Sequence, residues 1–234
     1  MVPLLGPHDA FPPIESAPPE LDGLIAVGGT LLPDRLLDAY RRGLFPWGTV
    51  EGQPLWFSPD PRMVLFPQEF RLTRSLRKTL RNAPFEVAFD RNFAGTIRAC
   101  SDMPRPGQNG TWISDDMIDA YVRLHELGWA HSVETYVEGE LVGGLYGLAI
   151  GRMFYGESMF SRRTDASKFA FAHLVRLLIS RGIEMIDCQM RTDHLASLGG
   201  REIARADFLG RLRALTGAGD RRVDWSADGA DFSW

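Results

Sequence analysis

The spacing of apolar residues changes along this chain, and the change predicts where helices give way to strands. Helical spacing, with apolar residues three and four apart, predicts helices over 33–42, 74–82, 90–99, 114–128, 165–181, 193–198 and 205–215. Alternation of apolar and polar residues predicts strands over 85–89, 131–137, 141–149, 153–157 and 183–189. The chain therefore combines both kinds of element along most of its length.

Polar residues and glycines mark the ends of these elements. Thr73 and Ser114 stand where a side-chain oxygen can cap a helix N-terminus. Tight turns at 138–140 and 150–152 join three strands into a meander. A long helix then crosses over to strand 183–189, so the expected fold class is α/β with a mixed sheet.

The N-terminal quarter has a different character. Residues 1–32 are rich in Pro and Gly and predict irregular, extended chain. The aromatic segments between 44 and 62 are broken by prolines, so they cannot form long helices. We expect a small N-terminal domain over 1–62 and a larger domain over 63–234, with a weakly structured tail after about residue 215.

Composition excludes some classes of protein. The 234 residues are 44% hydrophobic and 24% charged, which is typical of a globular protein. The net charge of −4 does not suggest a nucleic-acid partner, so local charge matters more. Cys100 and Cys188 alone supply neither a disulfide framework nor a metal cluster. We expect a cytoplasmic protein without a membrane anchor, because no signal segment and no long apolar run is present. We also expect a monomer without a bound metal.

The strand at 183–189 carries the best clue to function. Alternation predicts that Asp187 and Gln189 follow Ile183 and Met185 on one face. A row that turns polar at the carboxyl end of a strand is where open α/β sheets bind ligands. Cys188 would point to the opposite face as a small buried hydrophobe. The pattern therefore predicts an enzyme.

A second acid stands at the end of the meander. Glu157 lies among small and apolar residues, and a partly buried acid needs a cation or several donors. It could bind a cationic group of a substrate. It could also form a structural ion pair, for example with Arg162 or Lys168. The predicted position of Asp187 nearby favours the functional interpretation slightly.

The predicted helix over 74–82 has a basic face. No acidic residue occurs from 70 to 85, and the cations there are Arg71, Arg74, Arg77, Lys78 and Arg81. Positions 71, 74, 78 and 81 are spaced three, four and three apart, so they would share one helical face. Such a helix on an acidic protein suggests contact with phosphates. A solvated charged face is at least as common an explanation.

Aromatic residues gather in or beside the loops. They are Trp47, Trp56, Phe57, Trp112, Tyr121 and Phe154. Most aromatic residues belong to the core, but loop aromatics can stack on a base. The chain has no Rossmann, P-loop, nucleophile-elbow or zincin motif. His194 could be a base, although a surface or capping histidine is more common.

Several specific motifs occur in one order along the chain. They cover residues 23–29, 40–47, 56–62, 110–113, 124–128, 156–162, 186–189 and 194–199. In these motifs the chain closely resembles the bacterial leucyl/phenylalanyl-tRNA–protein transferases, from about residue 11 to about residue 212. Phe57 departs from the family, in which we expect Trp more often.

The resemblance implies an activity and a fold. Such enzymes move Leu or Phe, and also Met, from an aminoacyl-tRNA onto a protein with N-terminal Lys or Arg, which marks that protein for degradation by the N-degron route. The implied fold is a small N-terminal domain followed by a GNAT-like acyltransferase domain that uses no acetyl-CoA and no other cofactor. The residues support the last point independently, because segment 161–166 lacks the glycines of a pyrophosphate-binding loop.

The resemblance also implies roles for individual residues. Gln189 would accept a hydrogen bond from the attacking amine and Asp187 would orient it, while Glu157 and Asp187 would form an acidic pocket for the basic N-terminus. The slot for the donor side chain would be lined by Leu145, Phe154, Phe171, Leu174, Leu178 and Ile186. The tRNA and its terminal adenosine would contact Trp47, Trp112, Tyr40, Tyr121, Arg74, Arg77, Lys78 and Arg81.

Two other functions remain open from the sequence. An N-acyltransferase dependent on acyl-CoA would share the order of elements, although the missing pyrophosphate loop argues against it. A non-catalytic tRNA-binding module would explain the basic helix, but it would not explain acidic residues at strand ends.

Overall fold

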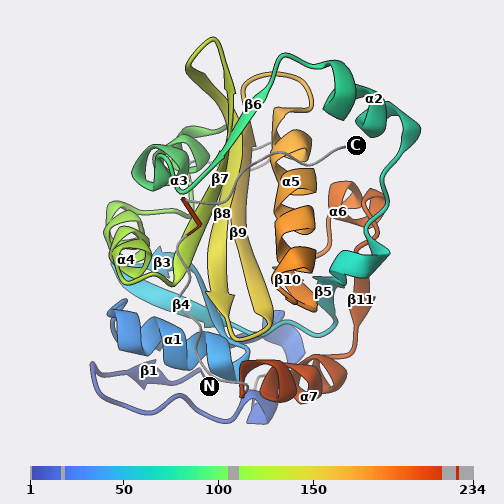
Figure 1. Ribbon diagram of the computed structural model, residues 1–234. Coiled ribbons are helices and arrows are strands. Elements are labelled where there is room, and N and C mark those ends of the chain that lie inside the picture. Colours follow the sequence, from blue (N-terminus) through green and yellow to red (C-terminus); the bar gives the residue numbers. More distant parts are fainter. Residues whose placement is uncertain (1, 17–18, 105–110, 218–224, 227–234) are drawn as a thin grey trace.

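A seven-stranded mixed sheet forms the centre of the larger part of the molecule (Figure 1). The computed structural model describes residues 2–16, 19–104, 111–217 and 225–226. The strand order is β11-β5-β10-β9-β8-β7-β6, and only β9 and β10 run parallel to each other. The strands are β5 (Arg62–Leu65), β6 (Glu86–Phe89), β7 (Ala130–Val137), β8 (Glu140–Ile150), β9 (Met153–Ser161), β10 (Met185–Gln189) and β11 (Arg201–Ile203).

The expected meander and crossover are confirmed. Strands β7, β8 and β9 pair in sequence through two tight turns, and Glu138, Gly139 and Gly151 in these turns have positive φ. Helix α5 (Ala166–Ser180) then leads to β10, which pairs in parallel with β9. A mixed α/β sheet is therefore correct, with the order of elements expected for a GNAT-like domain.

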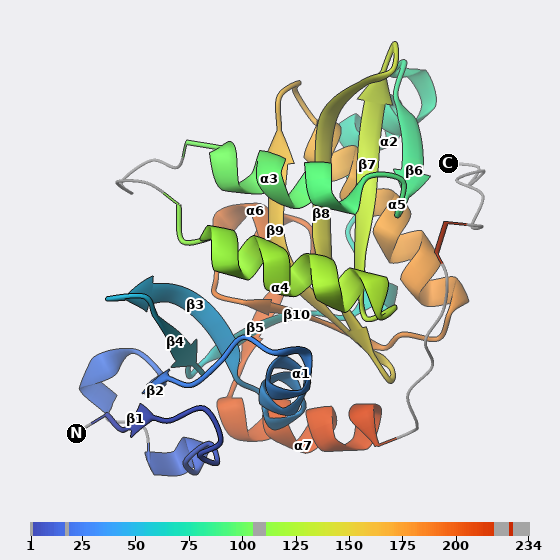
Figure 2. The ribbon, with the colours of Figure 1, turned by 90° about the vertical axis from the view of Figure 1, so that its left-hand side faces the viewer.

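Helices cover both faces of this sheet (Figures 1 and 2). Helices α3 (Phe93–Asp102) and α4 (Asp115–Glu126) lie on one face, while α5 packs on β7, β8 and β9 from the other. Helix α2 (Arg74–Asn82) contacts α5 at the outside. Most residues of α5 are buried, which explains why this helix is apolar nearly all round.

The N-terminal region forms a separate four-stranded sheet. Its order is β1 (Leu4–Leu5), β2 (Leu24–Gly28), β4 (Gln53–Phe57) and β3 (Phe45–Val50), with α1 (Pro33–Arg42) beside it. The proline-broken aromatic segments are thus strands, a result that the sequence left open. Helix α1 packs against α7 (Arg205–Thr216) and α4 of the larger part. Strand β5 begins at Arg62 and pairs with β10 in the large sheet, so the chain passes from the small sheet to the large one near this residue. The domain boundary near residue 62 stays a prediction.

One predicted helix start is wrong. Asp90 does not cap α3; its carboxylate instead accepts hydrogen bonds from His131 Nδ1 and the Ser132 N–H, both at 2.7 Å. Asn92 is the cap, and its side chain accepts from the Gly95 N–H at 3.0 Å. The caps predicted at Thr73 and Ser114 are confirmed.

The C-terminal segment contains a buried anchor. Trp225 is only 1% exposed, and its ring stacks on His131 at 4.1 Å and lies 5.9 Å from Phe154. The expectation of weak structure is therefore wrong for Trp225, because its ring is buried against His131 and Phe154. The other tail residues to which that expectation applied lie largely outside the described residues.

Candidate active site

A cavity opens where strands β9 and β10 separate. Their pairing ends at Asp187 and Tyr155, while β9 continues to Ser161. The cavity measures about 430 Å³, which is within the range of small-molecule sites. It lies at the carboxyl end of β10, beside the parallel strand β9, and carboxyl ends of strands are where open α/β sheets favour ligands.

Five of the six residues predicted for the apolar slot line the cavity. Leu145, Phe154, Phe171, Leu174 and Ile186 all line the cavity, so strands β8 to β10 and helix α5 supply its apolar wall. The prediction is wrong for Leu178, which is fully buried one helical turn beyond Leu174 and does not reach the cavity. Further lining residues that sequence reasoning missed are Phe45, Tyr146, Ser158, Met159, Met190, Thr192 and Leu195.

Two of the predicted aromatic residues stand at the same cavity. Trp47 on β3 and Trp112 both line it. A Cβ atom at Gly48 would lie 3.8 Å from that of Trp112, so the strand that carries Trp47 runs beside the second tryptophan. Phe57, which replaces the expected Trp, packs edge-on against Trp47 at 5.4 Å and braces it.

The two predicted tyrosines are placed differently. Tyr40 and Tyr121 are fully buried, and neither lines the cavity. The structure does not bring these two side chains to the cavity, and their predicted contact with the tRNA and its terminal adenosine stays a prediction. Tyr121 instead donates its hydroxyl proton to Glu157 Oε2 at 2.8 Å.

Gln189 breaks the alternation of its strand. The Met190 N–H donates to the Cys188 carbonyl at 2.7 Å, which is the hydrogen bond of a γ-turn around Gln189. Gln189 has φ of +58°, a conformation that costs a non-glycine residue about 1–2 kcal/mol. The turn directs Gln189 into the cavity beside Cys188, whereas alternation had predicted opposite faces for these two residues. Such strain is concentrated at functional sites.

Asp187 is held by a buried arginine. Arg62 Nε donates to Asp187 Oδ1 at 2.8 Å and Arg62 Nη2 donates to Oδ2 at 2.6 Å, with both side chains fully buried. The guanidinium also lies over the rings of Phe45 and Phe208. The expectation that Asp187 lines an acidic pocket is therefore wrong, because its charge is matched by Arg62 and it does not reach the cavity.

Asp187 nevertheless contacts Gln189. Its Oδ1 accepts a hydrogen bond from the Gln189 backbone N–H at 3.0 Å, which fixes the start of the strained turn. Sequence reasoning missed Arg62, although this residue closes the motif at 56–62.

Glu157 is the acid that enters the cavity. Burial raises its pKa to about 7, and the neighbouring Tyr40 and Tyr121 hydroxyls moderate this rise. Its Oε1 accepts from Gln189 Nε2 at 3.2 Å. The alternative of an ion pair with Lys168 or Arg162 is wrong: Lys168 pairs with Asp165 at 2.8 Å, and Arg162 donates to a main-chain carbonyl.

Cys188 and His194 also line the cavity. Burial raises the pKa of the Cys188 thiol, so this residue stays protonated and is a poor nucleophile. Burial lowers the pKa of His194, which was expected as a surface or capping residue. Its Nε2 is buried and has no hydrogen-bond partner among the described residues.

The structure places the cations of α2 on the exposed side of the helix, as the sequence predicts. Leu76 and Leu80, by contrast, are buried. The exposed cations are Arg74, Arg77, Lys78 and Arg81. Within the described residues, no cluster of His, Cys, Asp and Glu could hold a metal ion. No helix there has the length and apolarity needed to cross a membrane.

Comparison with known proteins shows which family the chain resembles. The chain is 71% identical to the leucyl/phenylalanyl-tRNA–protein transferase of Dechloromonas aromatica, with 99% of each chain covered. It is 56% identical to the enzyme of Nitrosospira multiformis, over 97% of this chain and 98% of that one. A GCN5-related N-acetyltransferase from Kribbella flavida is similar at 13% identity and a TM-score of 0.39, over 62% of this chain and 55% of that one.

Two family models match the chain in succession. The N-terminal domain model of the leucyl/phenylalanyl-tRNA–protein transferases covers residues 29–60, and the model of the transferase itself covers residues 64–213. The chain belongs to the leucyl/phenylalanyl-tRNA–protein transferase family. It is an aminoacyltransferase that acts on an aminoacyl-tRNA and a protein.

Proposed function

We propose that the enzyme transfers Leu or Phe, and also Met, from tRNA to the α-amine of proteins with N-terminal Lys or Arg. The observation that carries this proposal is a single cavity with an apolar wall that ends at Glu157 and Gln189. The product is marked for degradation by the N-degron route. The enzyme acts in the cytoplasm, where aminoacyl-tRNA is made, and works as a monomer.

The apolar wall binds the donor side chain. Phe171 and Leu174 on α5 line the cavity together with Leu145, Phe154 and Ile186 on the sheet. An apolar slot selects by size, and one methylene changes binding by only about 1–3 kcal/mol. Several unbranched or γ-branched apolar donors are therefore accepted.

The acid at the end of the cavity binds the acceptor. Glu157 carries the only acidic side chain among the residues that line the cavity within the described structure. Its charge attracts the basic side chain of N-terminal Lys or Arg. Asp187 contributes to this site through Gln189 rather than through its own charge.

The reaction is an aminolysis of an ester. The amine nitrogen attacks the ester carbonyl carbon, a C–N bond forms, the C–O bond to the tRNA ribose breaks, and the amine proton passes to the departing hydroxyl. The amine has a reference pKa of about 7.7–8.0, so an appreciable fraction is neutral at cell pH. Positioning by Gln189 then supplies much of the acceleration, for which about 7–11 kcal/mol is accessible.

The remaining predicted contacts bind the tRNA. Trp47 and Trp112 bracket the terminal adenosine, since stacking on aromatic rings tolerates any base and contributes about 1–3 kcal/mol. The basic face of α2 holds backbone phosphates. Both contacts position the ester at the cavity without contributing to the chemical step.

Transfer to peptides of matched sequence tests this function. The enzyme is incubated with leucyl-tRNA and peptides that begin with Arg, Lys, citrulline or Ala, and products are followed by mass spectrometry. We expect one added leucine on the Arg and Lys peptides and little on the citrulline and Ala peptides. Equal transfer to citrulline, which has the shape of Arg without its charge, would contradict the role of Glu157.

The basic face of α2 predicts a salt-dependent loss of binding. Arg77→Ala with Lys78→Ala is expected to weaken tRNA binding and to reduce the slope of log K against log salt by about 1–2. Filter binding over a range of salt concentrations measures this. Arg211→Ala with Arg213→Ala removes two exposed cations from α7 at the other end of the molecule (Figure 1) and should leave the slope unchanged. Equal slopes for both double variants would exclude the proposed contact.

A further inference from the structure

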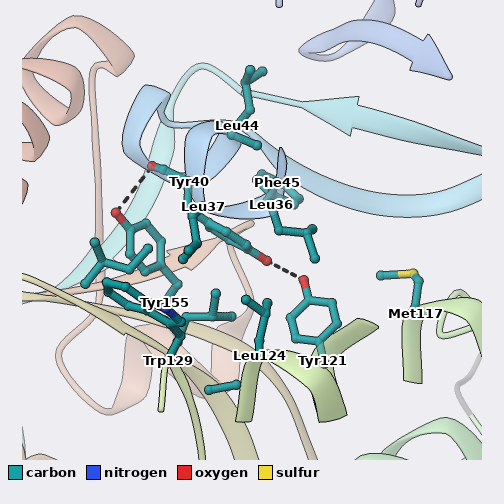
Figure 3. Packing of buried hydrophobic residues seen from close by; sticks show 14 of the residues in the cluster. Leu36, Leu37, Tyr40, Leu44, Phe45, Met117, Tyr121, Leu124, Trp129 and Tyr155 are labelled. Carbon is teal, nitrogen blue, oxygen red and sulfur yellow. Dashed lines mark hydrogen bonds between the residues drawn. The ribbon is translucent and has the colours of Figure 1, made fainter. Parts of the chain in front are cut away.

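A chain of hydrogen bonds links the N-terminal region to the active site. Tyr40 on α1 and Tyr121 on α4 are hydrogen-bonded through their hydroxyls (Figure 3). Tyr121 in turn bonds to Glu157 Oε2, and Glu157 Oε1 accepts from Gln189. Each member comes from a different element, so the chain joins α1, α4, β9 and β10.

The direction of these bonds follows from the number of protons. A tyrosine hydroxyl has one proton, and Tyr121 gives its proton to Glu157. Tyr40 must therefore be the donor to Tyr121. Burial raises the pKa of both tyrosines well above its ordinary value, so both remain protonated donors over the physiological range.

The two tyrosines are themselves firmly held. Tyr155 donates its hydroxyl to the Tyr40 carbonyl at 3.3 Å, and its ring lies 4.9 Å from that of Tyr40 (Figure 3). Tyr121 packs edge-on against Tyr146 at 5.6 Å. Phenylalanine would fill the same space without the cost of burying two hydroxyls, so the hydroxyls point to a purpose beyond packing.

Glu157 determines which way the Gln189 amide faces. An ionised carboxylate only accepts hydrogen bonds, so it holds the Nε2 end of the amide toward itself. The Oε1 end is then left for the amine, and no hydrogen bond within the described residues engages it. A protonated Glu157 could donate to Oε1 and would favour the opposite amide orientation, which presents N–H groups to the amine.

We propose that Tyr40 and Tyr121 are positioning residues that fix Glu157, and through it hold the Gln189 amide with its oxygen toward the acceptor amine. This inference rests on the proposed function, in which Gln189 receives that amine. It also makes the N-terminal region part of the active site, because Tyr40 belongs to α1.

Several groups influence the ionisation of Glu157. Burial raises its pKa, the neighbouring Tyr40 and Tyr121 hydroxyls lower it, Asp187 raises it and Arg62 lowers it. Gln189 also donates to it, and the other ionisable residues of the cavity are Tyr146, Cys188 and His194. Loss of the Tyr121 hydroxyl is therefore expected to raise the pKa of Glu157.

Three phenylalanine variants test the proposal by steady-state transfer from leucyl-tRNA to an Arg peptide over a range of pH. Tyr121→Phe should lower kcat about tenfold or more, with KM for leucyl-tRNA unchanged, and should shift the acid limb of the kcat profile to higher pH. Tyr40→Phe should act in the same direction with a smaller effect. Tyr136→Phe is the matched control, since it removes the hydroxyl of a buried tyrosine on β7 whose ring packs against Arg91, outside the chain of hydrogen bonds, and its profile should stay in place.

The outcomes separate this inference from the function on which it rests. A Tyr121→Phe enzyme with the profile and kcat of Tyr136→Phe would overturn the inference, as would an unshifted profile in a folded Tyr40→Phe enzyme if Tyr121→Phe fails to fold. Gln189→Leu is measured alongside. If Gln189→Leu is impaired and the tyrosine variants are not, the inference alone fails. If Gln189→Leu transfers normally, the proposed role of Gln189 is wrong, and the inference that rests on it fails as well.

Discussion

Asp187→Ala is expected to lower the free energy of unfolding by about 3–5 kcal/mol, because it leaves the Arg62 guanidinium buried without its counter-charge. Domains are stable by only about 5–15 kcal/mol in total, so part of the protein could unfold under assay conditions. Urea denaturation followed by tryptophan fluorescence measures the loss. An unchanged midpoint would show that the Arg62–Asp187 pair does not support the fold.

A double variant separates stability from activity. Arg62→Met with Asp187→Leu replaces the buried ion pair by apolar side chains of similar volume, a change that is often neutral or stabilising. The Gln189 N–H still loses its acceptor, at a cost of about 1–3 kcal/mol. We therefore expect most of the stability to return while transfer stays impaired. A low rate in Asp187→Ala alone would not establish a catalytic role.

The sequence predicted the location of the site better than its internal geometry. The polar end of the strand that holds Asp187 and Gln189 was visible as an interruption of an apolar row, and the basic face of α2 followed from helical spacing. Both signals are local, since neighbours along one element determine them. The residues assigned to the donor slot came from the family resemblance. All of them except Leu178 line the cavity, and their role in binding the donor stays a prediction.

Contacts between distant segments were not predictable in this way. Arg62 and Asp187 are 125 residues apart, and Tyr40 and Tyr121 are 81 residues apart, so no periodicity links them. Their pairing arises from the order of strands in the large sheet and from the docking of α1 on α4. Alternation also gave the wrong orientation for the Gln189 side chain. The γ-turn at Gln189 has a positive φ without a glycine, so the sequence contains no local signal for it.

Gln189→Leu is expected to slow aminoacyl transfer by about 10²-fold, which is the scale of a small misplacement of reacting groups. Leucine fills the same space but cannot accept a hydrogen bond from the amine or donate to Glu157 Oε1. The tRNA contacts lie on other residues, so binding of leucyl-tRNA should be unchanged. Gln189→Asn is the companion variant: it keeps the amide but shortens the side chain, and it should lose most of the rate if position matters more than chemical type.

The direct test of the central claim is the single-turnover rate of leucine transfer to an Arg peptide by Gln189→Leu, beside the Kd of the same variant for leucyl-tRNA. A rate about 10²-fold below wild type with an unchanged Kd is the predicted result. A rate close to that of the wild type would contradict the positioning of the acceptor amine by Gln189.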